Sequence, residues 1–363
     1  MAIATTAGLY RHEQDASITS VGNRVRELPP EIASEILDDV ITGSAALQLG
    51  AVSRMTRREK IFNLTETLPE AYWIRGTTAT DKPAFGPGSS QTDSSREAKD
   101  LAMKQTTSMT WTQKRMEAEE MAVLVPLPDT WKADSDVDFE EIKPYLVEAM
   151  SKKLDAAILF GEEVPTSWVA SGFRGILPDA IGRGNSVAAT SYPVVGSSPA
   201  RLDYGLAIAA LAEQMAEDGY DPTGFVTYPG FKWKLVQMRG NNGEPIYQGA
   251  LVGADGRPAQ TVYGETLAEV RSGIWNTHKD DALIIAGQWN TLKIGIRQDI
   301  EFAVTDSAPI FNQAGTLVLN TFQQDAKVLR ATFRVAANVI NPLMRLGGEY
   351  PFSVLRPDAD YSS

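Results

Sequence analysis

The residue types that most often carry catalysis are scarce in this sequence. The chain has 363 residues and no cysteine, which excludes cysteine nucleophiles, thiolate zinc sites and iron–sulfur clusters. It has two histidines, His12 and His278, far apart in the sequence, so acid–base catalysis by histidine would have to rest on one of them. His278 is followed by Lys279, Asp280 and Asp281, which places it beside carboxylates. A solvated loop is the simpler interpretation of that segment.

One acidic cluster has the spacing of a metal-binding loop. Asp134, Asp136 and Asp138 are placed like the first three ligands of a calcium loop. The sixth position of such a loop should be glycine and is Phe139, and the twelfth should be glutamate and is Tyr145. The cluster is better interpreted as the acidic start of a helix, where the helix dipole favours negative charge. We therefore expect no catalytic residue, no cofactor and no metal site.

The charge balance is acidic. Lysine and arginine number 34 against 46 aspartates and glutamates, a formal net charge of −12. A protein that grips nucleic acid by its phosphates should carry the opposite sign, at least locally, whereas acidic charge favours solubility and weak adhesion to DNA. The apolar runs are far too short to span a bilayer, and the N-terminal residues lack the pattern of a signal peptide. We expect no membrane segment.

A short basic run stands out against this acidic background. It consists of Arg54, Arg57, Arg58 and Lys60. A solvated face is the default interpretation, because exposed ion pairs contribute only about 0–1 kcal/mol each. The functional alternative is contact with an acidic surface on a neighbouring copy of the chain. The partners available for that contact are Glu117, Glu119 and Glu120, or the acidic cluster formed by Asp134, Asp136 and Asp138 with the residues up to Glu141.

Hydrophobic periodicity in the first third predicts a docking helix and a long arm. The apolar stripe from Ile32 to Ile41 predicts a helix too short to be stable alone, which must dock on another surface. Alternation predicts strands near 62–68, 108–112 and 121–127. Together with the Gly/Pro/Ser/Thr-rich segment 76–95, they suggest a two-stranded arm with a long tip. Such a ribbon is marginal alone and should lie on another surface.

A long helix, a second helix and several strands follow. Helical spacing predicts a long helix from Asp138 to a stop at Gly161. The second helix should start at Ser198-Pro199 and end at Gly219. Its predicted buried face consists of Leu202, Leu206, Ala209, Ala212 and Met215. Alternation then predicts strands over 292–297, 300–305 and 329–339.

The tryptophans are candidates for core or interface positions. The sequence does not separate these roles, and the core is the better prediction for any one of them. The residues concerned are Trp111, Trp131, Trp168, Trp233, Trp275 and Trp289.

Several segments resemble, in order and spacing, those of one known family. The long helix ends in Asp155-Ala156-Ala157-Ile158-Leu159-Phe160-Gly161, and Pro165 and Gly175-Ile176-Leu177 follow it. The segments Ala286–Phe302 and Gln323–Pro342 are similar as well. The chain thereby resembles, over nearly its whole length, the major capsid proteins of tailed bacteriophages. Those proteins share the Hong Kong 97-type fold.

The resemblance implies an α+β fold of this type. It has an N-terminal arm, an extended E-loop hairpin, a peripheral domain with a long spine helix, and an axial domain. The N-terminal arm would span 1–52 and the E-loop 53–125. The peripheral domain would span 126–197 and the axial domain 198–321, and 322–363 would return to the peripheral domain and form the C-terminus.

The resemblance also implies a structural role in place of an enzymatic one. Copies would form hexamers and pentamers that close into an icosahedral shell enclosing phage double-stranded DNA without sequence-specific binding. Axial domains would meet at the centre of each ring, and E-loops would lie over neighbours. Assembly in the bacterial host cytoplasm would yield the virion capsid. The expected partners are a portal and optional decoration proteins, with scaffolding either supplied by a separate protein or unnecessary.

Two other functions stay open at this point. An encapsulin-type bacterial compartment shares the fold, although encapsulins generally have shorter chains and a less developed N-terminal arm. A soluble enzyme or binding module using His278 and the acidic loops would instead form a monomer or a small oligomer.

Overall fold

A long antiparallel pair of strands, which we call the ladder, forms the centre of the four-stranded sheet in the computed structural model. The structure describes residues 44–67, 69, 107–129, 139–194, 202–238, 261–270, 273–311, 314–341 and 350–358. The predicted docking helix at Ile32–Ile41, the segment 76–95, and Asp134, Asp136 and Asp138 lie outside these residues. The ladder joins β10 (Leu292–Thr305) to β13 (Ala326–Val339), each 14 residues long.

Two further strands complete a four-stranded sheet around this ladder. The order is β1-β10-β13-β4, with β1 (Ala51–Arg54) parallel to β10 and β4 (Glu119–Pro128) antiparallel to β13. The two strands predicted over 292–297 and 300–305 are one strand, because β10 continues through register shifts between Ile296 and Glu301. Such bulges bend a strand without ending it.

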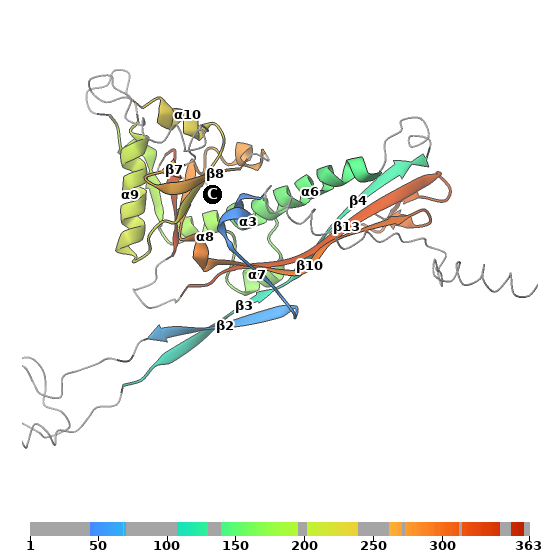
Figure 1. The fold of residues 1–363 in the computed structure, drawn as a ribbon, viewed down its shortest axis with the longest axis horizontal. Helices are drawn as coiled ribbons and strands as arrows, with labels where there is room; N and C mark the ends of the chain where they lie inside the picture. The colour runs from blue at the N-terminus through green and yellow to red at the C-terminus, as the bar shows by residue number, and fades with distance from the viewer. Residues whose placement is uncertain are drawn as a thin grey trace, which may run out of the picture.

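The predicted long helix is confirmed. α6 (Phe139–Asp155) continues into a π-helical turn, η2 (Ala156–Phe160), and lies along the four-stranded sheet (Figure 1). Gly161 ends it with a φ of +77°, and a Cβ there would lie 2.4 Å from the Arg174 carbonyl oxygen. Only glycine fits this left-handed and crowded position.

A six-stranded sheet holds most of the remaining core. Its order is β5-β14-β9-β6-β8-β7. The strands are β5 (Ser186–Ala188), β14 (Phe352–Arg356), β9 (Ile284–Gly287), β6 (Gly224–Thr227), β8 (Glu265–Glu269) and β7 (Thr261–Val262). The domain division predicted from the sequence assigns β5 and β14 to the peripheral domain, whereas the other strands of this sheet fall in the predicted axial domain. Both strands pair inside the sheet, because β14 lies between β5 and β9.

Short helices pack around the two sheets. They are α3 (Ala45–Leu49), α7 (Thr166–Ala170), α8 (Ile176–Gly182), α10 (Phe231–Val236) and the 3-10 turns η3 (Ala189–Ser191), η4 (Ile274–Thr277) and η5 (Trp289–Thr291). Within the described ranges, no helix is long and apolar enough to cross a membrane.

The second predicted helix starts later and buries a different face. α9 (Tyr204–Glu217) is capped by Asp203, whose side chain accepts a hydrogen bond from the Leu206 amide. Its buried residues are Ala207, Ile208, Leu211 and Met215. The prediction of a buried Leu206 and Ala209 was wrong, because both are exposed. Apolar residues occur on several sides of this helix, so periodicity could not single out the face that packs on the sheet.

A buried carboxylate joins the end of α6 to the start of α3. The Asp155 carboxylate accepts hydrogen bonds from Ser44 Oγ at 2.5 Å and from the amides of Ala45 and Ala46 at 3.1 and 3.2 Å. These amides belong to the first turn of α3, where backbone donors have no partner within the helix. Burial raises the pKa of Asp155 to about 6, against the opposing effect of these hydrogen bonds.

This raised pKa predicts a pH dependence of stability. Because the pKa in the folded state exceeds its ordinary value of 3.8, the contribution of Asp155 is complete below that value and is lost as pH rises through about 6. Relative to Asp155→Asn, the wild-type free energy of unfolding should therefore fall by about 3 kcal/mol between about pH 4 and about pH 8. Urea unfolding of both unassembled subunits measures this difference. A difference that stays constant with pH would contradict the assignment.

Candidate assembly surface on the arm

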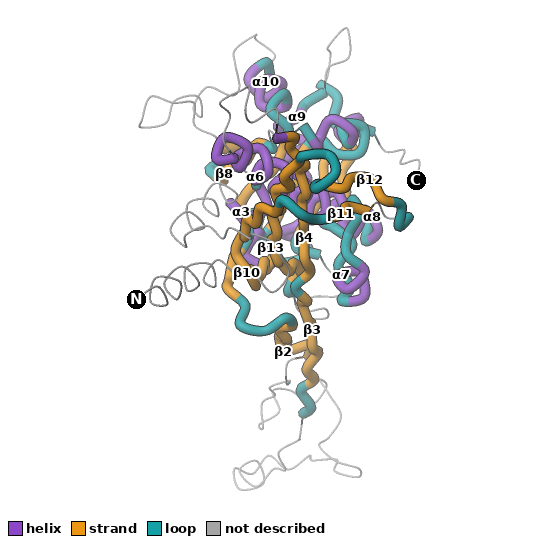
Figure 2. The backbone as a smooth tube through the Cα atoms, turned by 90° about the vertical axis from the view of Figure 1, so that its right-hand side faces the viewer, coloured by secondary structure: helices purple, strands orange, loops and turns teal. Residues whose placement is uncertain are grey.

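The arm predicted from the sequence is an isolated antiparallel hairpin. β2 (Glu59–Thr67) pairs only with β3 (Thr110–Glu117) among the described strands. Figure 2 shows the hairpin projecting away from the two sheets. The prediction of a two-stranded arm is confirmed. The third predicted strand, now β4, pairs with β13 in the four-stranded sheet.

The two faces of the hairpin differ. Phe62 and Met116 lie on the face turned toward the body, where Met116 is buried against Met55 in a small cluster separate from the main core. The opposite face carries Ile61 and Trp111, which are 55% and 65% exposed. Side chains two residues apart on a strand share a face, so this face also carries Arg115, opposite Ile61, and the pair Asn63 and Gln113, which lies between Ile61 and Trp111. We call this exposed set the outer arm face.

The root of the arm is held at one rung of the ladder. Arg54, the last residue of β1, stands opposite Ile296, which pairs with Val335 across the ladder. Val335 in turn stands opposite Glu119, the first residue of β4. The chain therefore leaves the sheet and returns to it at the same level, on opposite edges. Gly295 lies beside this rung, and a Cβ on it would lie 2.3 Å from the Met55 sulfur.

Side-chain hydrogen bonds fix β3 to the end of β13. Lys114 Nζ donates to Asn341 Oδ1 at 2.7 Å and to the Val339 carbonyl at 3.2 Å. Asn338 Nδ2 donates to the Arg115 carbonyl at 2.7 Å. Burial lowers the pKa of Lys114 to about 8, because the ammonium is partly removed from water. The base of the arm is thus held by specific polar contacts as well as by the methionine cluster.

Trp168 adds a contact from α7. Its Nε1 donates to the Glu117 carbonyl at 2.9 Å, and its ring is buried against Phe173. The described end of β3 is therefore tied to both β13 and α7.

The structure pairs part of the basic run within its own chain. Arg58 contacts Glu117 at 2.9 Å and Glu119 at 3.4 Å. Arg54 contacts Asp299 at 3.2 Å. Lys60 reaches Ser53 Oγ at 3.4 Å, and its ammonium lies 5.2 Å from the centre of the Phe62 ring. These groups are at the surface, so their contact with another copy stays a prediction.

Two of the residues predicted to contact another copy, Arg57 and Glu120, have exposed side chains. Arg57 is exposed and forms no ion pair with any residue that the structure describes. Glu120 is exposed on β4, where it stands opposite Arg334 of β13. The contribution of Asp134, Asp136 and Asp138 also stays a prediction, because they lie outside the described residues.

Sequence reasoning missed the exposed tryptophans. Trp168, Trp275 and Trp289 are buried, as predicted. Trp111 and Trp233 are exposed, so the core prediction was wrong for both, and Trp131 lies outside the described residues. The signal for Trp111 was its position on a ribbon with no second layer to bury it.

His278 is not in a solvated loop. Its Nε2 lies 2.8 Å from Glu162 Oε1 and its Nδ1 lies 3.1 Å from Asp281 Oδ2. The ring stacks on Phe160 with centroids 4.3 Å apart. His278 follows η4 and contacts Phe160 and Glu162 at the end of the spine helix. It therefore links the segment between β8 and β9 of the six-stranded sheet to that helix. Both ring nitrogens are already engaged in this structural contact.

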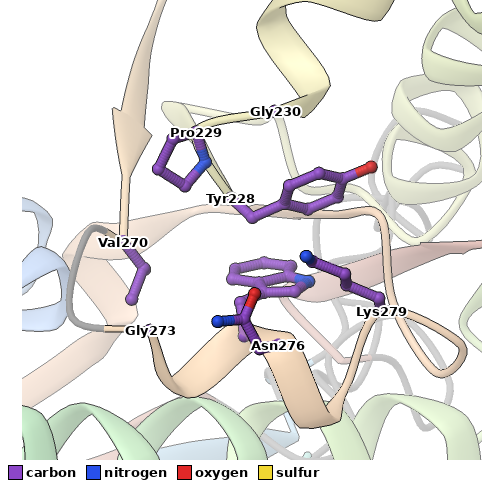
Figure 3. Close-up of a pocket in the computed structure, with 8 residues that line it drawn as sticks. Tyr228, Pro229, Gly230, Val270, Gly273, Asn276 and Lys279 are labelled. Atoms are coloured by element: carbon purple, nitrogen blue, oxygen red, sulfur yellow. The ribbon is translucent and has the colours of Figure 1, made fainter.

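A separate pocket of about 270 Å³ lies between α10 and η4 (Figure 3). Tyr228 and Trp275 supply aromatic walls, and Asn276 and Lys279 supply polar groups. The Lys279 ammonium lies 5.5 Å from the centre of the Tyr228 ring, a cation–π contact. Among the described residues, neither a carboxylate nor His278 lines this pocket. Across the described ranges, no group of three histidine, aspartate or glutamate side chains could hold a metal ion.

The two sheets, the spine helix and the projecting arm together form the Hong Kong 97-type fold, which is the fold of phage capsid shell proteins. The model of the phage capsid family matches residues 27–343 of this chain. The chain therefore belongs to the phage capsid family, with the Hong Kong 97-type fold, and it is a structural protein of a phage capsid shell.

Individual relatives agree with this assignment. The major capsid protein of Staphylococcus phage 80alpha is 25% identical over 314 residues, covering 85% of this chain and 80% of that protein. A solved structure from Microbacterium phage Oxtober96 has a TM-score of 0.66 and 28% identity, covering 87% and 91% of the two chains. One from Mycobacterium phage Adephagia has a TM-score of 0.67 and 25% identity, covering 88% and 92%. These relatives are phage proteins, not encapsulins or enzymes.

A structural role for His278 predicts a loss of stability. His278→Ala removes the close contacts with the Glu162 and Asp281 carboxylates and the stacking on Phe160. The free energy of unfolding should fall by about 1–3 kcal/mol, as urea unfolding would measure. Lys279→Ala, which changes the exposed neighbouring residue, is the control and should have a smaller effect. An unchanged stability in His278→Ala would contradict the structural role.

Proposed function

We propose that this chain is the major capsid protein of a tailed bacteriophage and that its copies form hexamers and pentamers that close into an icosahedral shell. The observation that carries the proposal is the family match over residues 27–343. The solved phage structures with TM-scores of 0.66 and 0.67, at 28% and 25% identity, support it. The shell encloses double-stranded DNA without reading its sequence, and the net charge of −12 agrees with a wall to which DNA adheres weakly.

The arm serves contact between copies in this proposal. An isolated two-stranded hairpin is marginal in water, and this one exposes Ile61 and Trp111 on its outer face. A neighbouring copy that covers this face removes the apolar surface from water and steadies the hairpin. The open Arg57 lies at the root of the same arm, where it can meet an acidic surface of the neighbour, such as that around Glu120.

Other partners follow from the family resemblance. They are a portal, a scaffolding protein and optional decoration proteins, with assembly in the bacterial host cytoplasm. The domain division given above also belongs to this proposal, except that β5 and β14 pair in the six-stranded sheet and β10 pairs in the four-stranded sheet.

The mass and shape of the purified protein test the proposed function directly. Light scattering and negative-stain microscopy should find closed shells, or rings of five or six copies, after co-expression with the phage scaffolding protein where needed. A fixed dimer or tetramer that scaffolding does not change would overturn the proposal.

The outer arm face gives a sharper test. Trp111→Ser should reduce the yield of shells at least about tenfold, since an exposed aromatic anchor at an interface typically contributes 2 kcal/mol or more. The subunit should keep its unfolding temperature, because Trp111 is exposed in the free chain. Trp111→Phe is the matched control and should still assemble. Normal shells from Trp111→Ser would show that this face does not contact a neighbour.

Arg57 allows a clean test of the basic run. Reversing Arg54 or Arg58 also breaks their pairs with Asp299, Glu117 and Glu119. Arg57→Glu breaks no ion pair among the described residues, so a defect in assembly would report contact between copies. We expect fewer shells from a folded subunit, measured by sedimentation, with Arg57→Lys as the control. If Arg57→Glu assembles normally, the arginine is merely solvated.

A further inference from the structure

Four strands of the six-stranded sheet end at the same edge. β6 and β14 lie antiparallel to β9 on its two sides, with Thr227 and Leu355 both opposite Ile284. β8 is parallel to β6, and β5 is parallel to β14. The carboxyl ends of these four strands therefore lie along one edge of the sheet. Open sheets of parallel strands commonly bind ligands at that edge.

The pocket between α10 and η4 lies at this edge. Tyr228 directly follows β6, Val270 directly follows β8, and both line the pocket. Trp275 of η4 adds a second aromatic wall. Two aromatic walls around about 270 Å³ of space suit a planar ring.

Two polar side chains of the pocket are available to a ligand. Lys279 forms no ion pair with any residue that the structure describes, and its ammonium points toward the Tyr228 ring (Figure 3). The Asn276 side chain forms no hydrogen bond within the same described ranges. Both residues are exposed. An ammonium beside aromatic walls fits a group that combines a ring with a carboxylate.

The chain itself supplies such a group just beyond β14. The structure describes this strand and the residues up to Asp358. The sequence continues as Ala359-Asp360-Tyr361-Ser362-Ser363, which lies outside the described residues. Asp360 and Tyr361 place a carboxylate next to an aromatic ring.

This segment starts close enough to the pocket to reach it. Only β9 lies between β14 and β6, and two strand spacings amount to about 10 Å. Asp358 Oδ1 accepts a hydrogen bond from Thr190 Oγ1 at 3.3 Å, which fixes the point where the segment leaves the sheet. The three residues from Asp358 to Tyr361 span up to about 10 Å when extended. The tyrosine side chain adds to that reach.

Attachment to the same chain favours this segment over a free ligand. A group held by a short flexible linker has an effective concentration in the millimolar range. One ring in a pocket and one ion pair at the surface then suffice to keep the segment bound, although exposed ion pairs contribute only about 0–1 kcal/mol.

We propose that residues 359–363 fold back over the carboxyl edge of the six-stranded sheet and occupy the pocket of their own chain. The Tyr361 ring packs on the two aromatic walls, and the Asp360 carboxylate pairs with Lys279. The bound segment ties η4, which precedes β9, to the end of β14. The inference concerns a single chain, so it goes beyond the proposed function and does not depend on it.

Disulfide trapping in the unassembled subunit tests this contact. The chain has no cysteine, so Asn276→Cys with Ser362→Cys introduces one thiol at the pocket and one beside Tyr361. With oxidised glutathione, the two protein thiols lose two protons and two electrons and form one disulfide, while glutathione is reduced to two thiols. Intact mass and labelling of free thiols should show most chains linked internally.

A second pair of thiols is the matched control. Tyr145→Cys with Ser362→Cys places one thiol on an exposed residue near the start of α6, which extends away from the six-stranded sheet (Figure 1). This pair should link at least about tenfold more slowly. Equal rates for the two pairs, or no link in the pocket pair, would overturn the inference.

Substitutions in the trapped protein test the two contacts separately. Added to the pocket pair of thiols, Tyr361→Ala or Lys279→Met should slow linking at least about fivefold, and Tyr361→Phe should link as fast as the parent. An unchanged rate with Tyr361→Ala would show that the ring does not occupy the pocket. A covalent dimer in place of the internal link would assign the pocket to a segment of another copy and would also overturn the inference.

Discussion

The pairing of β10 with β13 is the interaction on which the rest of this structure depends. The ladder connects the six-stranded sheet at one end to the hairpin of β11 (Pro309–Phe311) and β12 (Leu317–Asn320) at the other. It carries β1 and β4 on its two edges. The arm leaves from β1 and returns through β4 at the rung formed by Ile296 and Val335. Two ends held across one sheet at the same level fix the direction of a hairpin that has little burial of its own.

Long, regular patterns allowed correct predictions. Alternation over residues 329–339 identified β13, and helical spacing with a terminal glycine identified the spine helix up to Gly161. The arm was predicted from two segments of alternating polar and apolar residues, near 62–68 and 108–112, on either side of the polar segment 76–95. These features arise from neighbours in the sequence, which is the information that periodicity contains.

Features set by distant residues could not be predicted in this way. The face that α9 buries depends on the sheet beneath it, since its sequence offers apolar residues on several sides. His278 is explained by Glu162, which lies 116 residues away in the sequence. Arg58 finds Glu117 and Glu119 only because β2 and β3 pair. The sequence identified the charged residues at the root of the arm but could not show their partners within the chain. Their contact with another copy stays a prediction.

The distribution of charge connects the fold to assembly. An acidic chain stays soluble as a subunit and must still pack against copies with the same charge. In the proposed function, the outer arm face, which leaves Ile61 and Trp111 exposed, is a surface suited to that packing. The arm leaves and rejoins the four-stranded sheet at one rung, which sets the direction of the arm before any contact forms. In the proposed function, contact with a neighbouring copy buries apolar surface at a defined place, and the ordering of a marginal hairpin offsets part of that gain.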